Sequence, residues 1–333
     1  MTGANLALAT KGLRKSYGSR LALDGLDLSV PTGVVYGFLG PNGAGKTTTM
    51  RVLTGLIHPD GGSMELLGRP FSGRDRQRLF DVGALVESPA FYPYLSGREN
   101  LKALAASGAK LPARRIDEVL EIVGLRERSR DKVSRYSLGM KQRLGIAGAL
   151  LNDPMLLLLD EPANGLDPAG IVAMRATLRH LASIGKTVFI SSHLLAEVQQ
   201  MADVVGIIAA GRLVREGTMQ ELLASDGIVR VRVQPEEATS AAATLARFTV
   251  PERVSPPAPG SGWISVQVSP ERSSDVNRAL AQVGIYAAEM SIGNDLEELF
   301  LTLTGESSAT DRDGRFAQIN SSSAPVPLPE VES

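Results

Sequence analysis

The sequence of 333 residues contains no cysteine and only three histidines. Without cysteine the chain can form no disulfide, no thiolate zinc site and no cysteine nucleophile. The absence of cysteine also favours a reducing compartment. The histidines, His58, His180 and His193, lie too far apart along the sequence to indicate a metal cluster. Thiol-based chemistry is therefore excluded as an explanation of function.

Neither an excess of charge nor a long apolar run is present. The 35 Lys and Arg residues nearly balance 36 Asp and Glu residues, so the chain has no global basic field and we expect no nucleic-acid partner. The longest apolar runs, 155–159 and 204–210, fall short of the roughly 18 residues that a membrane-spanning helix needs. Charges near the N-terminus stand where a signal peptide would have its apolar block, so we expect no signal peptide. We therefore expect a soluble chain, or one that a partner attaches to a membrane.

What the chain does have is apolar material for a core. Hydrophobic residues make up 43% and charged residues 21%, which excludes wholesale disorder. Residues 1–45 alternate apolar runs with turn signals, a pattern typical of strands joined by tight turns. From there to residue 226, helical patterns alternate with apolar strands such as 155–159 and 187–191. The alternation predicts an α/β domain over 1–226, with a mostly parallel sheet, an antiparallel N-terminal part and a helical insertion near 95–150.

Two sequence signatures predict where helices start. Ser96 is followed three residues later by Glu99, and Thr218 is followed at the same spacing by Glu221. Each pair fits the capping box, in which the two residues satisfy each other's backbone N–H groups.

The composition changes after about residue 226. A period-2 strand, an alanine-rich helical stretch, a Pro/Gly linker at 256–262, a second strand and two helical patterns follow. We interpret residues 227–304 as a small α+β domain. Residues 305–333 are rich in Ser, Pro, Gly and Asp and predict a disordered tail.

A glycine-rich segment fits the pattern GxxxxGK[ST]. It follows an apolar strand and opens a helix, which is the context that a phosphate-binding loop requires. Glycines let backbone N–H groups turn toward an anion, and the helix N-terminus adds its dipole. Lys46 would reach the β and γ phosphates, and Thr47 would bind Mg²⁺. The alternative is a glycine-rich turn before a capped helix. The segment consists of Gly40, Pro41, Asn42, Gly43, Ala44, Gly45, Lys46, Thr47 and Thr48.

An acidic pair follows the apolar run at 155–159. Carboxylates at the carboxyl end of a central strand lie where open α/β sheets bind ligands. Asp160 would hold Mg²⁺, and Glu161 could polarise an attacking water. The alternative is a core strand that meets an acidic helix cap.

A third element, YSLGMKQR at 136–143, resembles the LSGGQ signature of ABC ATPases. Ser137 and Gly139 stand at a helix start, where a hydroxyl, N–H groups and the dipole can bind an anion. The resemblance implies that these two residues bind the γ-phosphate of ATP held by a second copy. The alternative is a serine N-cap on a basic surface helix.

The remaining parts follow in the order of the ABC ATPases. The resemblance implies that Tyr17 stacks on adenine, that Asp167 lies at a dimer seam and that His193 contacts the γ-phosphate. Glu87 stands where most relatives carry a glutamine that ligates Mg²⁺. Other departures are Tyr136, Leu138 and Met140 within the signature.

The resemblance covers residues 6–225. Within it, the segments 83–100 and 136–154 look like ATPases of bacterial drug and antibiotic exporters, including bacitracin- and anthracycline-resistance types. The resemblance implies a P-loop NTPase fold, ATP and Mg²⁺ as ligands, and pairing with a second copy. It also implies a separate integral-membrane permease that holds this chain at the cytoplasmic face of the membrane. The exported compound would be a drug, an antibiotic or a lipid-like molecule. Residues 88–95, apolar and aromatic, are the expected groove for a permease helix, with a surface loop as the alternative. Two rival functions stay open: a soluble ABC ATPase acting on nucleic acid or ribosomes, and a regulator that binds ATP without turnover.

Overall fold

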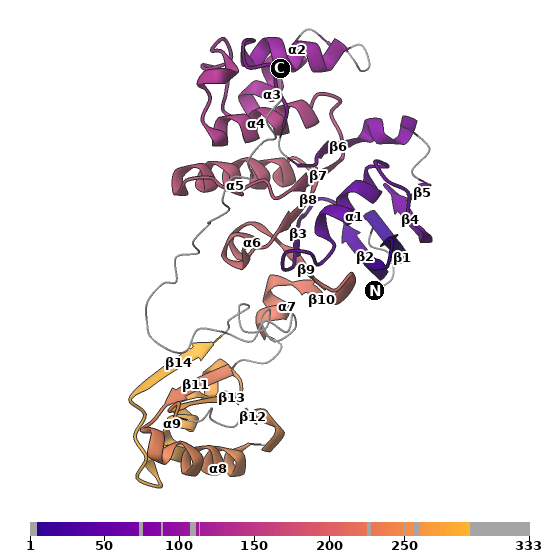
Figure 1. Ribbon diagram of the computed structural model, residues 1–333. Coiled ribbons are helices and arrows are strands. Elements are labelled where there is room, and N and C mark those ends of the chain that lie inside the picture. Colours follow the sequence, from indigo (N-terminus) through magenta and orange to yellow (C-terminus); the bar gives the residue numbers. More distant parts are fainter. Residues whose placement is uncertain are drawn as a thin grey trace, which may run out of the picture.

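The computed structural model describes residues 5–72, 76–87, 89–106, 111–112, 114–224, 228–249, 251–255 and 260–293 (Figure 1). A six-stranded sheet forms its centre, in the order β10-β9-β3-β8-β7-β6. Five strands are parallel, and β10 runs antiparallel to β9. The strands are β3 (Val35–Leu39), β6 (Val82–Leu85), β7 (Leu156–Asp160), β8 (Thr187–Ser192), β9 (Val204–Ala209) and β10 (Arg212–Thr218). The predicted mostly parallel sheet is confirmed.

The central sheet separates two hydrophobic cores. Successive side chains of a strand point to opposite faces, so Leu156 and Leu158 pack into one core while Leu157 and Leu159 pack into the other. This explains why β7 is a continuous apolar run: both faces are covered. One core contains α1 (Lys46–Leu53), and the other contains α4 (Leu138–Ala149) and α5 (Pro168–Ser183).

An antiparallel sheet with the order β2-β1-β4-β5 covers the core that contains α1. Figure 1 shows β1, β2 and β4 beside α1, on the side away from α5 and α6. The strands are β1 (Leu6–Tyr17), β2 (Arg20–Pro31), β4 (Gly61–Leu66) and β5 (Arg69–Pro70). The antiparallel N-terminal part expected from the sequence is therefore present.

Helices fill the segment between β6 and β7. They are α2 (Gly97–Ala106), α3 (Arg115–Ile122) and α4, with a short 3₁₀ turn at Val133–Arg135. The predicted capping box is confirmed at α2, because the Ser96 N–H and hydroxyl both donate to Glu99 Oε2 at 2.7 Å, and the Glu99 N–H donates back to Ser96 Oγ. Thr218 and Glu221 make the same exchange before α7 (Met219–Ala224). The remaining helix of this part is α6 (Leu195–Met201), and another 3₁₀ turn spans Arg76–Asp81.

Residues 228–293 form a separate sheet with its own hydrophobic core. Four antiparallel strands lie in the order β12-β13-β11-β14, and α8 and α9 contribute to the core. The elements are β11 (Ile228–Arg232), α8 (Ala238–Phe248), β12 (Val254–Ser255), β13 (Trp263–Gln267), α9 (Ser273–Ala281) and β14 (Glu289–Gly293), with 3₁₀ turns at Pro235–Glu237, Pro251–Arg253 and Pro270–Arg272. The last predicted helix and the predicted tail lie outside the described residues.

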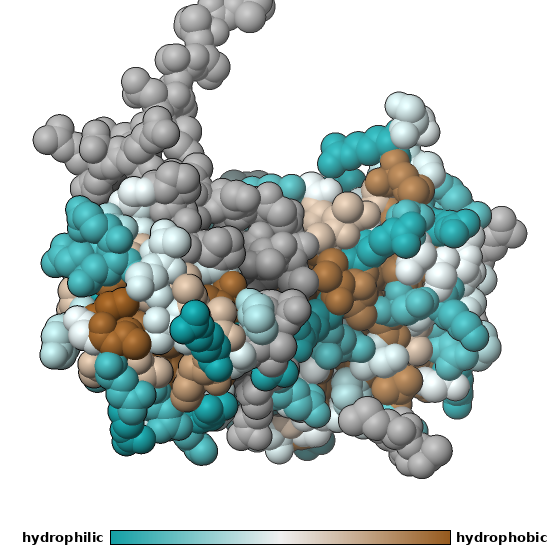
Figure 2. Space-filling view, turned by 90° about the horizontal axis from the view of Figure 1, so that it is seen from below, coloured by the Kyte–Doolittle hydropathy of each residue, from teal (hydrophilic) through white to brown (hydrophobic). Residues whose placement is uncertain are grey.

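Hydrophilic and apolar side chains are interspersed on the face shown in Figure 2. Within the described part of the chain, no helix combines the length and the apolar content that a membrane span requires.

Candidate functional site

The loop between β3 and α1 has a backbone shape that depends on glycine. Gly43 and Gly45 have φ angles of 82° and 112°, in the left-handed region that other residues rarely adopt. A Cβ at Gly45 would lie 2.7 Å from the carbonyl oxygen of Ala22, closer than atoms can approach. The loop therefore curls tightly and leads into the N-terminus of α1, where N–H groups and the helix dipole favour an anion.

Lys46, the first residue of α1, is buried. Its ammonium donates to the carbonyl oxygens of Gly40 at 2.7 Å and Pro41 at 3.2 Å. It also lies 3.3 Å from Oε1 of Glu161. A buried cation requires such partners because removing it from water is costly. The carbonyls of the loop thus hold the ammonium beside Glu161.

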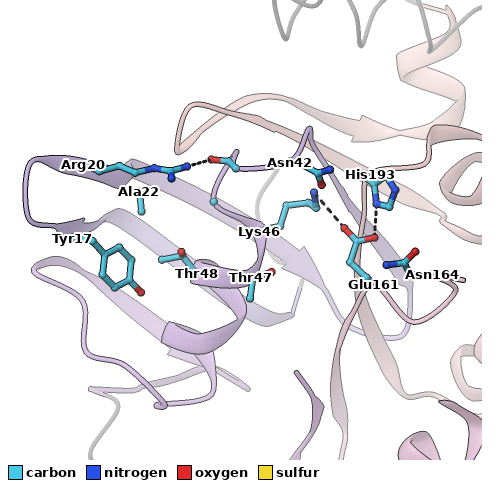
Figure 3. A pocket seen from close by; sticks show the side chains of 12 residues that line it. Tyr17, Arg20, Ala22, Asn42, Lys46, Thr47, Thr48, Glu161, Asn164 and His193 are labelled. Carbon is cyan, nitrogen blue, oxygen red and sulfur yellow. Dashed lines mark hydrogen bonds and ion pairs between the residues drawn. The ribbon is translucent and has the colours of Figure 1, made fainter. Parts of the chain in front are cut away.

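Glu161, which follows β7, connects Lys46 to His193, which follows β8. Its Oε2 lies 2.7 Å from Nδ1 of His193. Figure 3 shows the carboxylate between the ammonium and the imidazole. The three residues meet because parallel strands end at the same edge of the sheet. The arrangement puts a carboxylate, which can accept a proton, in contact with two groups that can carry positive charge.

Asp160, the last residue of β7, is buried beside Ser191 of β8. The Ser191 hydroxyl donates to Oδ1 of Asp160 and accepts the N–H of Glu161 at 2.9 Å. No local sequence pattern predicted a role for Ser191. The signal that could have indicated Ser191 is its position near the end of β8. This strand pairs with β7, and Asp160 and Ser191 are direct partners in that pairing.

A cavity of about 680 Å³ lies against the loop (Figure 3). A volume of this size is typical of sites for small molecules and cofactors. Nine predicted residues line it: Tyr17, Asn42, Gly43, Gly45, Lys46, Thr47, Thr48, Glu161 and His193. Arg20, Ala22 and Asn164 also line it and were not expected from the sequence. The Arg20 guanidinium donates to the Gly43 carbonyl oxygen at 3.5 Å and so helps to stabilise the loop.

The remaining predicted residues are not among those that line the cavity. The carbonyls of Gly40 and Pro41 bind Lys46, and Ala44 is buried. Asp160 is buried and accepts a hydrogen bond from Ser191. The others are Glu87, Ser137, Gly139 and Asp167.

Ser137 and Asp167 each cap a helix. The Ser137 hydroxyl accepts the N–H of Met140 at 3.2 Å, and Asp167 Oδ1 accepts the N–H of Gly170 at 2.9 Å. The two segments also lie close together, because a side-chain carbon of Leu166 lies 3.6 Å from the position of a Cβ on Gly139. Ser137 is exposed.

Glu87 lies outside the cavity and forms an ion pair with Arg51 of α1. Its φ angle of 68° is left-handed, which is uncommon for a residue other than glycine. The pair raises the pKa of the Arg51 guanidinium, chiefly through the hydrogen bond to Glu87. The expected metal-binding role of Glu87 therefore stays a prediction, and in this structure its carboxylate is bound by a cation.

The side chains present fit Mg²⁺ only together with phosphate. No group of three or more His, Asp or Glu residues that could hold a metal exists among the described residues. Magnesium usually takes one or two carboxylates plus substrate phosphates and water. The hydroxyl of Thr47 and the carboxylate of Asp160 are hard oxygen donors of the kind that Mg²⁺ prefers, so the donor set fits a metal that arrives with a nucleotide.

A second acidic residue near the site is Glu197 of α6. Burial raises the pKa of its carboxyl, and the charge of Glu161 adds to the increase, while hydrogen bonding from Ser192 and the charge of His193 oppose it. The Ser192 hydroxyl lies 3.4 Å from Glu197 Oε2. The charges of Glu161 and His193 thus act on the Glu197 carboxyl in opposite directions.

A separate groove of about 360 Å³ lies between β6, α2 and α4. We call it the helical-domain groove; its walls include Leu85, Pro89, Ala90, Phe91, Leu104, Ala105, Gly145 and Gly148. Three of these residues belong to the segment 88–95 that was expected to receive a permease helix, although residue 88 lies outside the described residues. The buried amide of Asn100 holds the following turn, because it donates to the Tyr92 carbonyl at 3.1 Å and accepts the Tyr92 N–H at 2.8 Å. Tyr92 and Tyr94 are exposed, with ring centroids 5.9 Å apart.

Comparison with known proteins finds consistent similarities. Residues 23–164 match the family model described as ABC transporter. The chain is 50% identical over 210 residues to the bacitracin transport ATP-binding protein BcrA of Bacillus licheniformis, covering 63% of this chain and 69% of that protein. It is 38% identical to the daunorubicin resistance ATP-binding protein DrrA3 of Streptomyces coeruleorubidus, covering 91% of this chain and 97% of that protein. The solved structure of cbiO1 from Clostridium perfringens, part of the ABC transporter complex cbiONQ, superposes with a TM-score of 0.61 at 27% identity, covering 66% of this chain and 91% of that chain.

Proposed function

Because the chain belongs to the family of ABC transporter ATP-binding proteins, we propose that it powers an exporter of a drug, an antibiotic or a lipid-like compound. Members of this family bind and hydrolyse ATP. The bacitracin transport and daunorubicin resistance relatives support a drug or an antibiotic as the cargo. No observation favours the rival function on nucleic acid or ribosomes.

In this proposal the cavity holds ATP along its length. The phosphates lie on the loop of residues 40–48, where Lys46 and the N–H groups of α1 neutralise their charge. Tyr17, which is 45% exposed at the end of β1, stacks on the adenine. Arg20 and Asn164 add a cation and an amide within the same cavity. The lining thus supplies an aromatic ring for the base and cationic and N–H groups for the phosphates.

Thr47 and Asp160 would hold Mg²⁺. The metal, when bound, neutralises developing charge on the phosphates. Glu87 would join this set only after leaving Arg51, because an ion pair occupies its carboxylate.

Glu161 is the proposed base for the attacking water. Its carboxylate reaches the cavity and is held by Lys46 at 3.3 Å and by His193 at 2.7 Å. When nucleotide phosphates arrive, they compete for Lys46, because a phosphate carries more negative charge than one carboxylate. Glu161 then keeps His193 as its partner and becomes available to water. His193 in turn can donate a hydrogen bond to the γ-phosphate.

A second copy of the chain would complete the site. Ser137 is exposed at the start of α4, where the helix dipole favours an anion. Ser137 and Gly139 of one copy would bind the γ-phosphate held by the other, with Asp167 beside the seam. ATP would join the two copies, and hydrolysis would separate them.

The helical-domain groove is the proposed docking site for a helix of a separate membrane permease. Its lining side chains are apolar except for that of Asn152, and exposed Tyr92 and Tyr94 follow its edge in sequence. This docking would place the protein at the cytoplasmic face of the membrane. We further propose that residues 1–226 act as the ATPase domain and 227–304 as a distinct small domain.

The observation that carries the proposal is the Lys46–Glu161–His193 contact inside a nucleotide-sized cavity. A direct test combines ATPase assays with co-purification from detergent-solubilised membranes. Leu104 lines the groove and Leu56 is exposed elsewhere. Leu104→Glu should abolish recovery of a permease with several apolar spans and keep the basal ATPase rate, whereas Leu56→Glu should keep both. Equal recovery with both variants would contradict the docking site, and absence of ATP hydrolysis in the parent chain would contradict the function.

A further inference from the structure

We propose that Ser191 is a positioning residue. Its single hydroxyl group orients both Asp160, the proposed metal ligand, and Glu161, the proposed base for the attacking water. Ser191 is fully buried near the end of β8. Its oxygen accepts the N–H of Glu161 at 2.9 Å, and its proton is donated to Oδ1 of Asp160. This inference rests on the proposed function, since it explains how two residues of that site are held in position.

The direction of these hydrogen bonds is fixed by proton count. The Glu161 backbone can only donate, so the serine oxygen is the acceptor in that contact. A hydroxyl has one proton, and it goes to the Asp160 carboxylate. Ser191 therefore donates its one proton to Asp160 and fixes the rotation of that side chain. The rotation decides where the second oxygen points, and thus where a water shared with Mg²⁺ can lie.

The backbone of Glu161 needs the same hydroxyl for a different reason. Its φ angle is 49°, in the left-handed region that is disfavoured for residues with a Cβ. Strained backbone of this kind persists only where the surroundings impose it. The N–H bond to Ser191 is such a constraint, and it turns the Glu161 side chain toward Lys46 and His193. Loss of the hydroxyl would free both the turn and the Asp160 carboxylate.

A purely structural role would make Ser191 equivalent to Thr187, at the start of the same strand. Thr187 is also buried, and its hydroxyl likewise accepts a backbone N–H, that of Gly33, at 2.9 Å. No carboxylate takes part in the Thr187 contact. Replacing Thr187 by Val removes that hydroxyl at nearly constant volume, so Thr187→Val is the matched control for the loss of a buried hydroxyl acceptor in β8.

The experiment uses the full-length chain and the variants Ser191→Ala, Ser191→Cys and Thr187→Val. The affinity for a non-hydrolysable ATP analogue is measured with and without Mg²⁺, together with kcat, KM for ATP and melting temperature. Loss of a residue that orients a metal-binding group typically costs about 10–100-fold in metal affinity or activity. We expect Ser191→Ala to lower kcat and to raise the half-saturating Mg²⁺ concentration by about tenfold each. KM for ATP at saturating Mg²⁺ and analogue affinity without Mg²⁺ should change less than about threefold.

Ser191→Cys keeps the side-chain shape with a weaker hydrogen-bond donor, so it should fall between the parent and Ser191→Ala, and it carries the test if Ser191→Ala does not fold. Thr187→Val should lower the melting temperature and leave the Mg²⁺ dependence unchanged. If the Ser191 variants lower only the melting temperature, as Thr187→Val is expected to do, the positioning role is wrong. ATP turnover by the parent chain would still support the proposed function in that case. If the parent itself shows no turnover, the proposed function fails, and the Mg²⁺ dependence of analogue binding still tests Ser191.

Discussion

The guanidinium of Arg51 and the carboxylate of Glu87 form an ion pair that joins α1 to the segment following β6. The same helix α1 begins with Lys46 in the nucleotide loop, and the same segment continues into the helical-domain groove. The pair therefore links the proposed phosphate site to the proposed permease site by a single contact. Both side chains are largely exposed, at 41% and 56%, so the link is weak enough to break during a catalytic cycle.

The first prediction concerns competition for Glu87. Arg51→Ala removes the cation that holds Glu87, so Glu87 becomes free to join the metal and the half-maximal rate should require less Mg²⁺. The effect on the free energy of unfolding should stay below about 1 kcal/mol, because the pair is exposed. The control is Arg51→Ala combined with Glu87→Gln. Because no Glu87 carboxylate is then present to be released, Arg51→Ala should leave the Mg²⁺ requirement unchanged in this background. An equal shift in both backgrounds would mean that Arg51 acts on the metal by charge alone.

The second prediction concerns Lys46. Lys46→Ala removes a charge-assisted contact of roughly 1.5–3 kcal/mol to phosphate and the charge that stabilises the transition state. Turnover should fall by on the order of 10² or more, measured as phosphate release at saturating ATP. The variant also leaves Glu161 without its buried cationic partner, so circular dichroism must first establish that it folds. Parent-like hydrolysis in a folded variant would refute the assignment of the phosphate loop.

The third prediction is a pH dependence of stability at Asp153. Its carboxylate binds Lys186 at 2.7 Å and Arg115 at 3.0 Å, and these contacts, the Lys186 hydrogen bond first, lower its pKa below the ordinary value of 3.8. A lowered pKa stabilises the fold above pH 3.8, and this stabilisation disappears as the pH falls through the folded-state pKa.

Asp153→Asn tests this prediction without disturbing the backbone, because asparagine tolerates the left-handed φ of 54° found here. At pH 7 the variant should unfold about 1 kcal/mol more easily, a value reduced for the exposure of the Asp153 side chain. Urea titrations should show the difference shrinking below pH 3.8, the ordinary pKa. A difference that does not depend on pH would assign the effect to shape and not to charge.

The sequence predicts the site as far as local patterns reach. The loop of residues 40–48 and the acidic pair after β7 are contiguous motifs, and each was identified in place. Ser191 lies 31 residues from Asp160, and their contact depends on the register between β7 and β8, for which no local pattern exists. The Arg51–Glu87 pair likewise joins residues far apart in the sequence, so no local pattern predicts it. Strand β10 was not expected either, because its period-2 pattern, RLVREGT, is short and strongly charged.

The four-stranded sheet of residues 228–293 shows the same limit. Its strands β11 and β13 were expected from alternating residues, and the alternation appears as buried Val229 and Val231 against Arg230 and Arg232. The order β12-β13-β11-β14 could not be predicted, because β14 joins the sheet beside β11 across more than fifty residues of chain.

The most direct measurement is the mass of Glu161→Gln in solution with ATP and Mg²⁺. Glutamine keeps the shape and most hydrogen bonds of Glu161 but cannot accept the proton from water, so ATP should bind and persist. Light scattering should then show a dimer with ATP and Mg²⁺ and a monomer with ADP. A second substitution, Lys46→Ala, should abolish the dimer by weakening nucleotide binding. A Glu161→Gln chain that binds ATP and stays monomeric at high concentration would contradict the proposal that two copies enclose the nucleotide.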